Sequence, residues 1–255
     1  MKTAIVTGGS RGIGFGVAKQ LGSEGYNIAI LDINAARDYQ DNLNSLTAMG
    51  VDCHYQQGSI TSKTDRESFV DAVTAKWGDI DVLVNNAGGA HGLDTAMDAS
   101  LDDWETMIDV NVKGLLYCTK AVVNEMAERG SGHIVNIGSV ASFTAYAGAN
   151  VYGGAKAFVA QFSRNLRSDL HGTGVRVTDI QPGLLESEFS LVRLKGDTAK
   201  AEAVYAGCEP LTPEDLADVI HYVTTLPRHI NIGLLRITPT CQSETGNLIY
   251  KGPGR

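Results

Sequence analysis

The chain has 255 residues, of which 43% are hydrophobic and 20% charged, and its formal net charge is −8. The acidic balance argues against nonspecific nucleic-acid binding, which needs a basic surface. No stretch approaches the roughly 18 apolar residues of a membrane helix, and the first residues lack the pattern of a signal peptide. We therefore expect a soluble, cytoplasmic protein without a nucleic-acid or membrane partner.

The predicted elements alternate along the chain between short apolar runs and longer stretches of helical period. Strands are expected at 3–7, 27–32, 52–57, 81–88, 132–139, 174–183 and 233–238, and helices at 12–25, 38–49, 63–77, 102–129, 151–170 and 213–226. Such alternation predicts an α/β fold with a doubly wound, Rossmann-like parallel sheet covered by helices on both faces. Without a linker or repeat, residues 1–255 are expected to form one dinucleotide-binding and catalytic domain.

One stretch, 184–212, fits this alternation least, because it holds mixed charges and no strand. Long insertions of this kind often cover a binding site. We therefore expect a small substrate lid at 184–212.

A glycine-rich turn, "TGGSRGIG" at 7–14, lies between the first predicted strand and the first predicted helix. Glycines let a backbone approach a pyrophosphate closely, and the helix N-terminus then faces its charge. The spacing departs from the strict G-x-G-x-x-G pattern, and a plain strand-to-helix turn is the alternative. The cofactor-binding residues predicted in this turn are Gly8, Ser10, Arg11, Gly12, Ile13 and Gly14.

The choice of cofactor depends on Asp32, which ends the second predicted strand 20 residues after Gly12. In a dinucleotide fold a carboxylate at this place accepts hydrogen bonds from the ribose hydroxyls and repels a 2′-phosphate. Arg11 favours the opposite outcome, because a cation in the glycine turn can pair with that phosphate. The sequence therefore favours NAD, with NADP as the alternative.

Tyr152 and Lys156 lie four positions apart in "VYGGAKAF", so they share one face of a predicted helix. A tyrosine with its usual pKa of about 10 is a poor acid–base group near neutrality, and a neighbouring ammonium group lowers that pKa. Gly153 and Gly154 between them each cost about 1 kcal/mol of helix stability relative to alanine. We expect these small residues to let the cofactor, the substrate or a neighbouring subunit approach this helix face closely.

Four motifs follow one another in the order and with the spacing of a known family: "TGGSRGIG", "NNAG" (85–88), "NIGS" (136–139) and "YGGAK" (152–156). Through them the chain resembles the short-chain dehydrogenase/reductase family over nearly its whole length. The resemblance implies that Ser139 orients the substrate oxygen and stabilises its developing charge. It also implies that Asn111, in "DVNVKG", holds a water that links Lys156 to solvent.

The resemblance also completes the expected cofactor site and implies that Lys156 binds the nicotinamide ribose. The added cofactor-binding residues are Asn85, Ala87, Gly88, Tyr152, Lys156, Pro182, Gly183 and Ser187, the last of them at the carboxamide. Ser59 stands where many members have an aspartate at the adenine, so a hydroxyl would have to serve there. Members are commonly tetramers, which implies a homotetramer packed through 102–129 and 151–170.

From about residue 100 onward the chain resembles the 3-hydroxy acid dehydrogenases, which are serine or allo-threonine dehydrogenase-like enzymes. The first hundred residues resemble ketoacyl-carrier-protein reductases more. That hydroxy acid subgroup usually favours NADP, and Asp32 departs from its pattern. The expected activity is hydride transfer between a nicotinamide cofactor and a small 3-hydroxy acid.

The expected substrate-binding residues are Ser139, Tyr152 and Arg193. Arg193 lies within the predicted lid, where its guanidinium could hold a substrate carboxylate through two hydrogen bonds. A helix with solvated charges is the alternative at that position. The alternatives for the whole protein are a 3-ketoacyl reductase, a polyol or sugar-acid dehydrogenase, and a non-catalytic dinucleotide sensor.

The four cysteines, Cys53, Cys118, Cys208 and Cys241, are scattered along the chain. Neither they nor the histidines show the spacing of metal ligands, so we expect no catalytic metal. We interpret the cysteines as reduced thiols in a reducing compartment and expect no structural disulfide.

Overall fold

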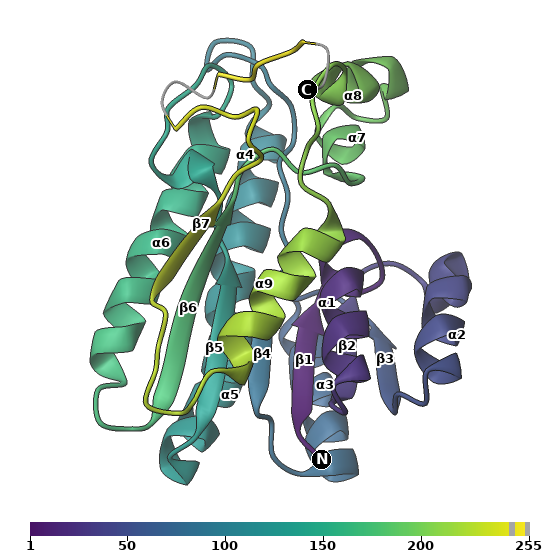
Figure 1. Ribbon diagram of the computed structural model, residues 1–255, viewed down its shortest axis with the longest axis vertical. Helices are drawn as coiled ribbons and strands as arrows, with labels where there is room; N and C mark the ends of the chain where they lie inside the picture. Colours follow the sequence, from purple (N-terminus) through teal and green to yellow (C-terminus); the bar gives the residue numbers. More distant parts are fainter. Residues whose placement is uncertain (245–247, 253–255) are drawn as a thin grey trace.

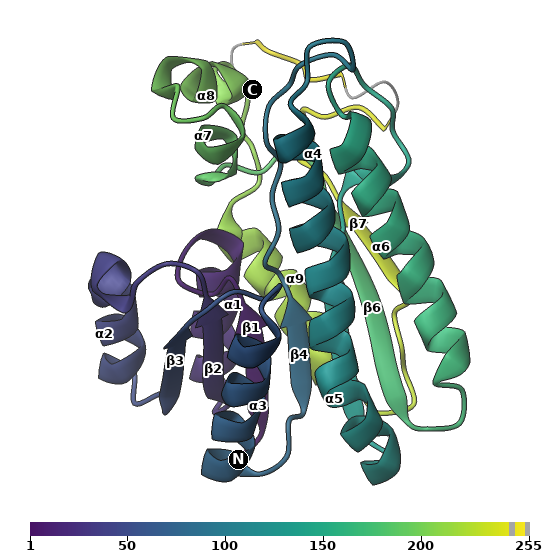
Figure 2. The ribbon, with the colours of Figure 1, turned by 180° about the vertical axis from the view of Figure 1, so that it is seen from behind.

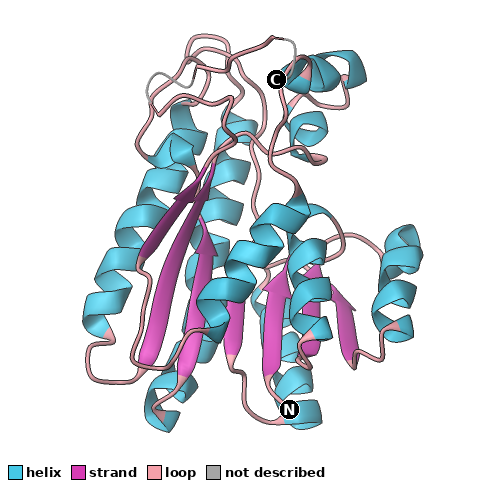
Figure 3. Ribbon diagram, in the orientation of Figure 1, coloured by secondary structure: helices cyan, strands magenta, loops and turns pink. Residues whose placement is uncertain are grey.

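A seven-stranded, all-parallel sheet forms the middle of the computed structural model, which describes residues 1–244 and 248–252 (Figures 1 and 3). The strands are β1 (Thr3–Thr7), β2 (Asn27–Asp32), β3 (Cys53–Gln57), β4 (Val82–Asn85), β5 (Gly132–Ile137), β6 (Val175–Pro182) and β7 (Leu234–Ile237), in the order β3-β2-β1-β4-β5-β6-β7. Every residue of β1 and β2 is buried, which is typical of a parallel sheet covered on both faces. The predicted doubly wound sheet is confirmed.

Helices cover both faces of this sheet, and two short helices lie above its carboxyl edge (Figures 1 and 2). The helices on the faces are α1 (Gly12–Ser23), α2 (Gln40–Ala48), α3 (Lys63–Trp77), α4 (Leu101–Ile108), α5 (Leu115–Arg129), α6 (Asn150–Asp169) and α9 (Pro213–Thr225), and the two short ones are α7 (Phe189–Arg193) and α8 (Thr198–Tyr205). One core contains side chains of α1 and α9, such as Leu21 and Ile220, against one face of the sheet. The other contains side chains of α3 and α5, such as Phe69 and Met126, and Figure 2 shows these helices from that side.

The predicted helix at 102–129 is not a uniform α-helix. A π-helical turn at Asp109–Gly114 separates α4 from α5. A Cβ on Gly114 would lie 2.4 Å from the Cδ1 atom of Ile60, so a larger residue there would require the Ile60 side chain to move. Single π turns inside α-helices occur frequently at functional sites, and this one carries Asn111.

The segment 184–212 contains the short helices α7 and α8, and it ends where α9 begins. α9 starts with a capping box in which Thr212 and Asp215 satisfy each other's backbone N–H groups, followed by Pro213 in its first turn. A Cβ on Gly16 of α1 would lie 3.1 Å from the carbonyl oxygen of Pro213. Gly16 therefore allows α1 and α9 to pack closely beneath this segment.

Candidate active site

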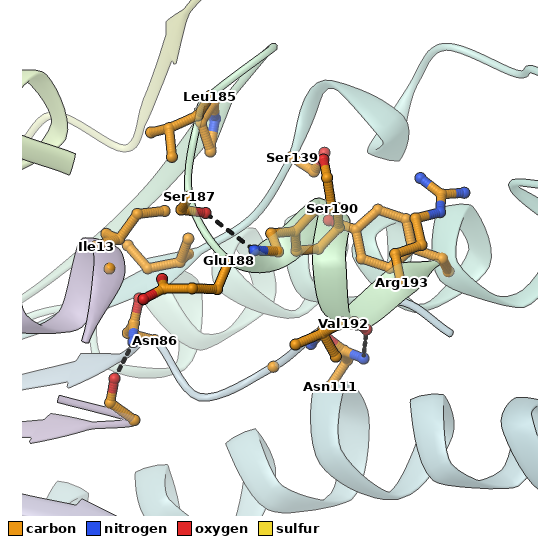
Figure 4. A pocket seen from close by; sticks show the side chains of 18 of the residues that line it. Ile13, Asn86, Asn111, Ser139, Leu185, Ser187, Glu188, Ser190, Val192 and Arg193 are labelled. Atoms are coloured by element: carbon orange, nitrogen blue, oxygen red, sulfur yellow. Dashed lines mark hydrogen bonds between the residues drawn. The ribbon is translucent and has the colours of Figure 1, made fainter. Parts of the chain in front are cut away.

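A cavity of about 600 Å³ lies at the carboxyl ends of the central strands (Figure 4). Its lining includes residues that end or directly follow β1, β2, β4, β5 and β6, and it extends from Asp32 to Arg193 of α7. Ligands of open parallel sheets bind at this edge, because all strand ends and the helix N-termini after them meet there.

The glycine turn forms one wall of the cavity. Gly8 and Gly12 have φ values of 65° and 51°, in the left-handed region that favours glycine. A Cβ on Gly14 would lie 2.2 Å from the carbonyl oxygen of Gly8, so only a glycine lets α1 begin this close to β1. The N-terminus of α1 is thereby left open to the cavity, and this cradle fits a pyrophosphate.

Three residues predicted to touch the cofactor lie behind this wall instead: Ser10, Gly14 and Asn85 are not among the residues that line the cavity. The buried Nδ2 atom of Asn85 donates to Thr119 and Asn136, at 3.0 and 2.9 Å. Successive side chains of a strand point to opposite faces, and Asn85, the last residue of β4, points toward α5. Asn85 thus joins β4, β5 and α5.

The neighbouring Asn86 lines the cavity, although the motif analysis did not select it. Its Nδ2 atom donates to the carbonyl oxygens of Thr7 and Gly8, both at 2.9 Å. Asn86 therefore fixes the turn after β1 to the turn after β4. Other lining residues that lie outside the four motifs are Tyr146, Glu188, Tyr205 and Gln242.

Asp32 lines the cavity at the other side of the glycine turn and is only 4% exposed. Its Oδ2 atom accepts from the backbone N–H of Ser10 at 3.0 Å, and its Oδ1 atom accepts from the backbone and side-chain nitrogens of Asn34 at 3.0 and 2.9 Å. Three donors therefore hold the carboxylate in one orientation. Arg11 also lines the cavity, with its guanidinium carbon 5.9 Å from the ring centroid of Tyr39.

The three central residues of the predicted catalytic set meet in the cavity. Tyr152 and Lys156, both on α6, are each 7% exposed, and Ser139 is 8% exposed. The Ser139 hydroxyl lies near enough to the Tyr152 phenol to lower its pKa, and it accepts from the backbone N–H of Ala141 at 3.1 Å. The Nζ atom of Lys156 donates to the carbonyl oxygen of Ile137 at 2.8 Å and lies 5.8 Å from the Tyr152 ring centroid.

The two glycines between Tyr152 and Lys156 differ in their surroundings. A Cβ on Gly153 would lie 3.3 Å from the carbonyl oxygen of Ala141, whereas one on Gly154 would meet no atom within 4 Å. Gly153 therefore lets α6 approach the turn that carries Ser139, a contact within the chain that the sequence analysis did not consider. The space beside Gly154 is open.

Asn111 reaches the same place from the π turn. Its Nδ2 atom donates to the carbonyl oxygens of Gly89 and Met107, at 2.8 and 2.9 Å, and its Oδ1 atom accepts from the Gly89 N–H at 3.2 Å. A Cβ on Gly88 would lie 2.6 Å from that Oδ1 atom and 3.6 Å from the Nζ atom of Lys156. Gly88 therefore lets Asn111 and Lys156 face one another closely.

Burial has the largest effect on the pKa values of Tyr152 and Lys156. It raises the pKa of Tyr152 to about 12, against the opposing effects of the Ser139 hydroxyl and the Arg193 charge. Burial lowers the pKa of Lys156 to about 8, and the charge of Asp179 opposes this. The charge of Arg193 thus lowers the phenol pKa beside the lysine that the sequence predicted for this effect.

Arg193 extends from α7 over the cavity. Its Nε atom donates to the carbonyl oxygen of Gly92 at 3.1 Å, its Nη1 atom to the Tyr146 hydroxyl at 3.1 Å, and its Nη2 atom to the carbonyl oxygen of Gly148 at 3.3 Å. The guanidinium carbon lies 5.6 Å from the Tyr152 ring centroid. Arg193 thus joins the segment 184–212 to the loops before α4 and α6, directly over the phenol.

The loop after β6 completes the wall, with Pro182, Gly183 and Ser187 in the lining. Gln242 holds this loop, because its Oε1 atom accepts from the backbone N–H of Leu184 at 2.7 Å. The side chain of Gln242 occupies the space where a residue other than Gly183 would place its Cβ. The C-terminal part of the chain therefore contributes to the site.

Within residues 1–244 and 248–252, no group of three or more His, Cys, Asp or Glu side chains could hold a metal ion. Among the same residues, no helix is long and apolar enough to cross a membrane.

Comparison with known proteins gives matches along nearly the whole chain. The NADP-dependent 3-hydroxy acid dehydrogenase YdfG of Escherichia coli strain K12 is 46% identical over 249 residues, which cover 97% of this chain and 98% of that protein. The serine 3-dehydrogenase of Rhizobium radiobacter is 41% identical over 250 residues, 98% of each chain. The closed form of serine dehydrogenase complexed with NADP+ has a TM-score of 0.89 and 45% identity, over 99% of this chain and 98% of that one.

These matches include the first hundred residues, so the expectation that the likeness to 3-hydroxy acid dehydrogenases is confined to the later part of the chain is not supported. The family model described as short chain dehydrogenase matches residues 2–195, which carry the glycine turn and all four predicted catalytic residues. The chain therefore belongs to the short chain dehydrogenase family.

Proposed function

We propose that this protein is a dehydrogenase that transfers a hydride between a nicotinamide cofactor and the 3-hydroxyl carbon of a small hydroxy acid. The observation that carries the proposal is the meeting of Ser139, Tyr152, Lys156 and Arg193 at one end of a cavity whose other end fits a dinucleotide. Relatives that match the whole chain are named for this class of substrate.

When bound, the nicotinamide supplies the hydride chemistry. The protein's part is to hold the substrate oxygen and to move one proton at it. Ser139 and Tyr152 present adjacent hydroxyls, so both can bind the same substrate oxygen and stabilise its developing charge. Tyr152 gives or takes the proton at its phenol oxygen, and Lys156 with Asn111 connects that position toward solvent.

The acid group of the substrate is assigned to Arg193. Three of the five N–H groups of a guanidinium are engaged with Gly92, Tyr146 and Gly148, which leaves two to bind a carboxylate. Because Arg193 lies over the ring of Tyr152, an acid that places its hydroxyl at Tyr152 brings its carboxylate toward the guanidinium.

For the cofactor we propose NAD, although relatives are named for NADP. The fixed carboxylate of Asp32 lines the cavity at the end of β2, where dinucleotide folds carry the residue that binds the adenosine ribose. Ile33 beside it, 71% exposed, offers no charge to a 2′-phosphate. Two like charges about 4 Å apart near a protein surface repel by about 4 kcal/mol, a discrimination of nearly 10³-fold. Arg11, beside Tyr39, opposes part of this effect.

The activity is tested with a panel of 3-hydroxy acids, sugar acids and polyols, each assayed with NAD and NADP. Tyr152→Phe should bind the cofactor normally but lose turnover, and Tyr222→Phe, on the exposed face of α9, is the matched control. Undiminished turnover in Tyr152→Phe would contradict the assignment of the proton donor. Cofactor binding without turnover on any panel member would favour a dinucleotide sensor.

The cofactor proposal is tested by the ratio of kcat/KM for NAD to that for NADP. We expect the ratio to exceed one in the natural protein and to fall by about 10³-fold in Asp32→Asn, because the repelling charge is removed. Asp38→Asn, an exposed change in the following turn, should leave the ratio unchanged. A natural protein that prefers NADP refutes the proposal.

The Arg193 assignment is tested by comparing a hydroxy acid with its neutral methyl ester. Arg193→Ala should lose kcat/KM on the acid far more than on the ester, since only the acid carries the charge that arginine binds. Tyr146→Phe, which removes one of the hydrogen bonds to Arg193, controls for a loosened lid. If Arg193→Ala lowers kcat/KM equally on the acid and on the ester, Arg193 does not bind the carboxylate and only holds the segment 184–212 in place.

A further inference from the structure

Two cysteines that are 33 positions apart in the sequence lie together beside the site. Cys208 follows α8 in the lid segment, and Cys241 follows β7 in the C-terminal part of the chain, which returns to α8 (Figure 1). The Sγ atom of Cys241 lies 3.6 Å from the carbonyl oxygen of Glu209, the residue after Cys208. Cys241 lies close enough to Cys208 to raise its pKa, and both side chains are partly exposed.

Further contacts hold the two backbones side by side. The N–H of Gly252 donates to the carbonyl oxygen of Gly207 at 3.0 Å, and the N–H of Tyr250 donates to the carbonyl oxygen of Cys241 at 2.8 Å. A Cβ on Gly207 would lie 3.5 Å from the Cβ atom of Lys251. The described residues 248–252 thus lie against both cysteine segments and hold them in register.

We propose that Cys208 and Cys241 form a reversible redox site, whose disulfide fastens the lid to the C-terminal part of the chain and slows turnover. A low-molecular-weight disulfide is the oxidant. One protein thiolate attacks it and releases one thiol, and the second protein thiolate then displaces the other thiol from the mixed disulfide. The protein dithiol loses two electrons and two protons, and the small disulfide becomes two thiols.

The position of the pair connects this chemistry to the cavity. Tyr205, three residues before Cys208, lines the cavity, and its hydroxyl contacts the Ser190 hydroxyl at 2.6 Å and the carbonyl oxygen of Leu185 at 3.1 Å. Gln242, directly after Cys241, holds the N–H of Leu184. A bond between the cysteines would therefore join two walls of the site, and restricting a lid slows enzymes whose turnover depends on its opening.

The surroundings also set the pH at which the site reacts. Burial raises the pKa of Cys208 above its usual value, as do Cys241 and the charge of Glu186, while the charge of Lys251 lowers it. The thiolate is the attacking species, so oxidation should be faster in mildly alkaline solution than at neutral pH.

The test treats the full chain with oxidised glutathione at about pH 8.5, near the usual thiol pKa, and maps peptides without reduction. We expect a linked Cys208–Cys241 peptide, a turnover that falls severalfold and recovers with dithiothreitol, and a melting temperature about 8 to 15 °C higher, for a closed loop of roughly 34 residues. The linked peptide is read by mass, so it does not depend on the proposed function.

Cys208→Ser and Cys241→Ser should each keep full turnover after the same treatment, and Cys53→Ser, on β3, should respond like the natural protein. Absence of the linked peptide, or glutathione retained on one cysteine in its place, overturns the proposal. If every molecule is linked and kcat is unchanged, the proposal that the disulfide slows turnover is overturned.

Discussion

Replacing Gly138 by alanine should disturb the protein at the point where the catalytic residues are held. Gly138 lies between Ile137, whose carbonyl oxygen holds Lys156, and Ser139. A Cβ here would lie 2.3 Å from the Oδ1 atom of Asp179 and 3.2 Å from its Cγ atom. Normal contacts of this kind are about 3.5 Å, so one partner has to move by about 1 Å.

The movement is costly because Asp179 has little freedom. It is 2% exposed, and its Oδ2 atom accepts from the Nε2 atom of Gln181 at 2.7 Å. Overpacking of this size typically costs 1–3 kcal/mol of stability. If the backbone of Ser139 moves instead, a displacement of about 1 Å can lower kcat by about 10²-fold.

The assay for Gly138→Ala combines urea denaturation with steady-state kinetics. Gly154→Ala is the stability control, because its Cβ meets no atom within 4 Å and alanine favours the helix by about 1 kcal/mol. The double variant Gly138→Ala/Asp179→Ala should recover part of the lost stability, since the clash is then relieved. A Gly138→Ala protein with natural stability and kcat would refute the explanation.

Three further predictions follow from the same contacts. Burial lowers the pKa of His133 from 6.5 to about 3, so the unfolded chain binds a proton that the folded chain excludes. Stability should therefore fall by up to about 5 kcal/mol as the pH drops from 6.5 toward 3, and acid denaturation of His133→Gln should lack this loss. Ser139→Ala should lower kcat by about 10²–10³-fold with little change in cofactor binding, as measured by titration. Asp179→Asn should lower the pKa of Lys156 below about 8 and so shift the pH–rate profile. Asp169→Asn, an exposed change on α6, the helix that carries Lys156, should leave the profile unchanged.

The sheet and the catalytic residues could be predicted because their signals are local. Alternating apolar runs determine the parallel sheet, and a four-residue spacing places Tyr152 and Lys156 on one helix face. The side of the sheet to which Asn85 points was missed, although its place at the end of β4, next to Asn86, decides it. Periodicity of two means that one of these neighbours faces the cavity and the other faces α5.

Other features could not be predicted because they depend on distant parts of the chain. Gln242 reaches the loop after β6 only because the chain returns past β7, and the same return brings Cys241 to Cys208. The π turn that directs Asn111 at Gly89 leaves no mark in the helical period of 102–129. The scattered cysteines therefore gave no sign of being neighbours.

Arg193 connects the segment 184–212 to the chemistry that we propose at Tyr152. Its guanidinium lowers the phenol pKa, and it does so from α7, which its bonds to Gly92 and Gly148 hold against the loops on the opposite side of the cavity. A displacement of α7 would break these bonds and remove the charge, and burial would then oppose ionisation of Tyr152 with less compensation. We therefore expect the phenol to exchange a proton most readily while these bonds are made. Any bond that restrains the segment 184–212 would act on these contacts and on the proton transfer together.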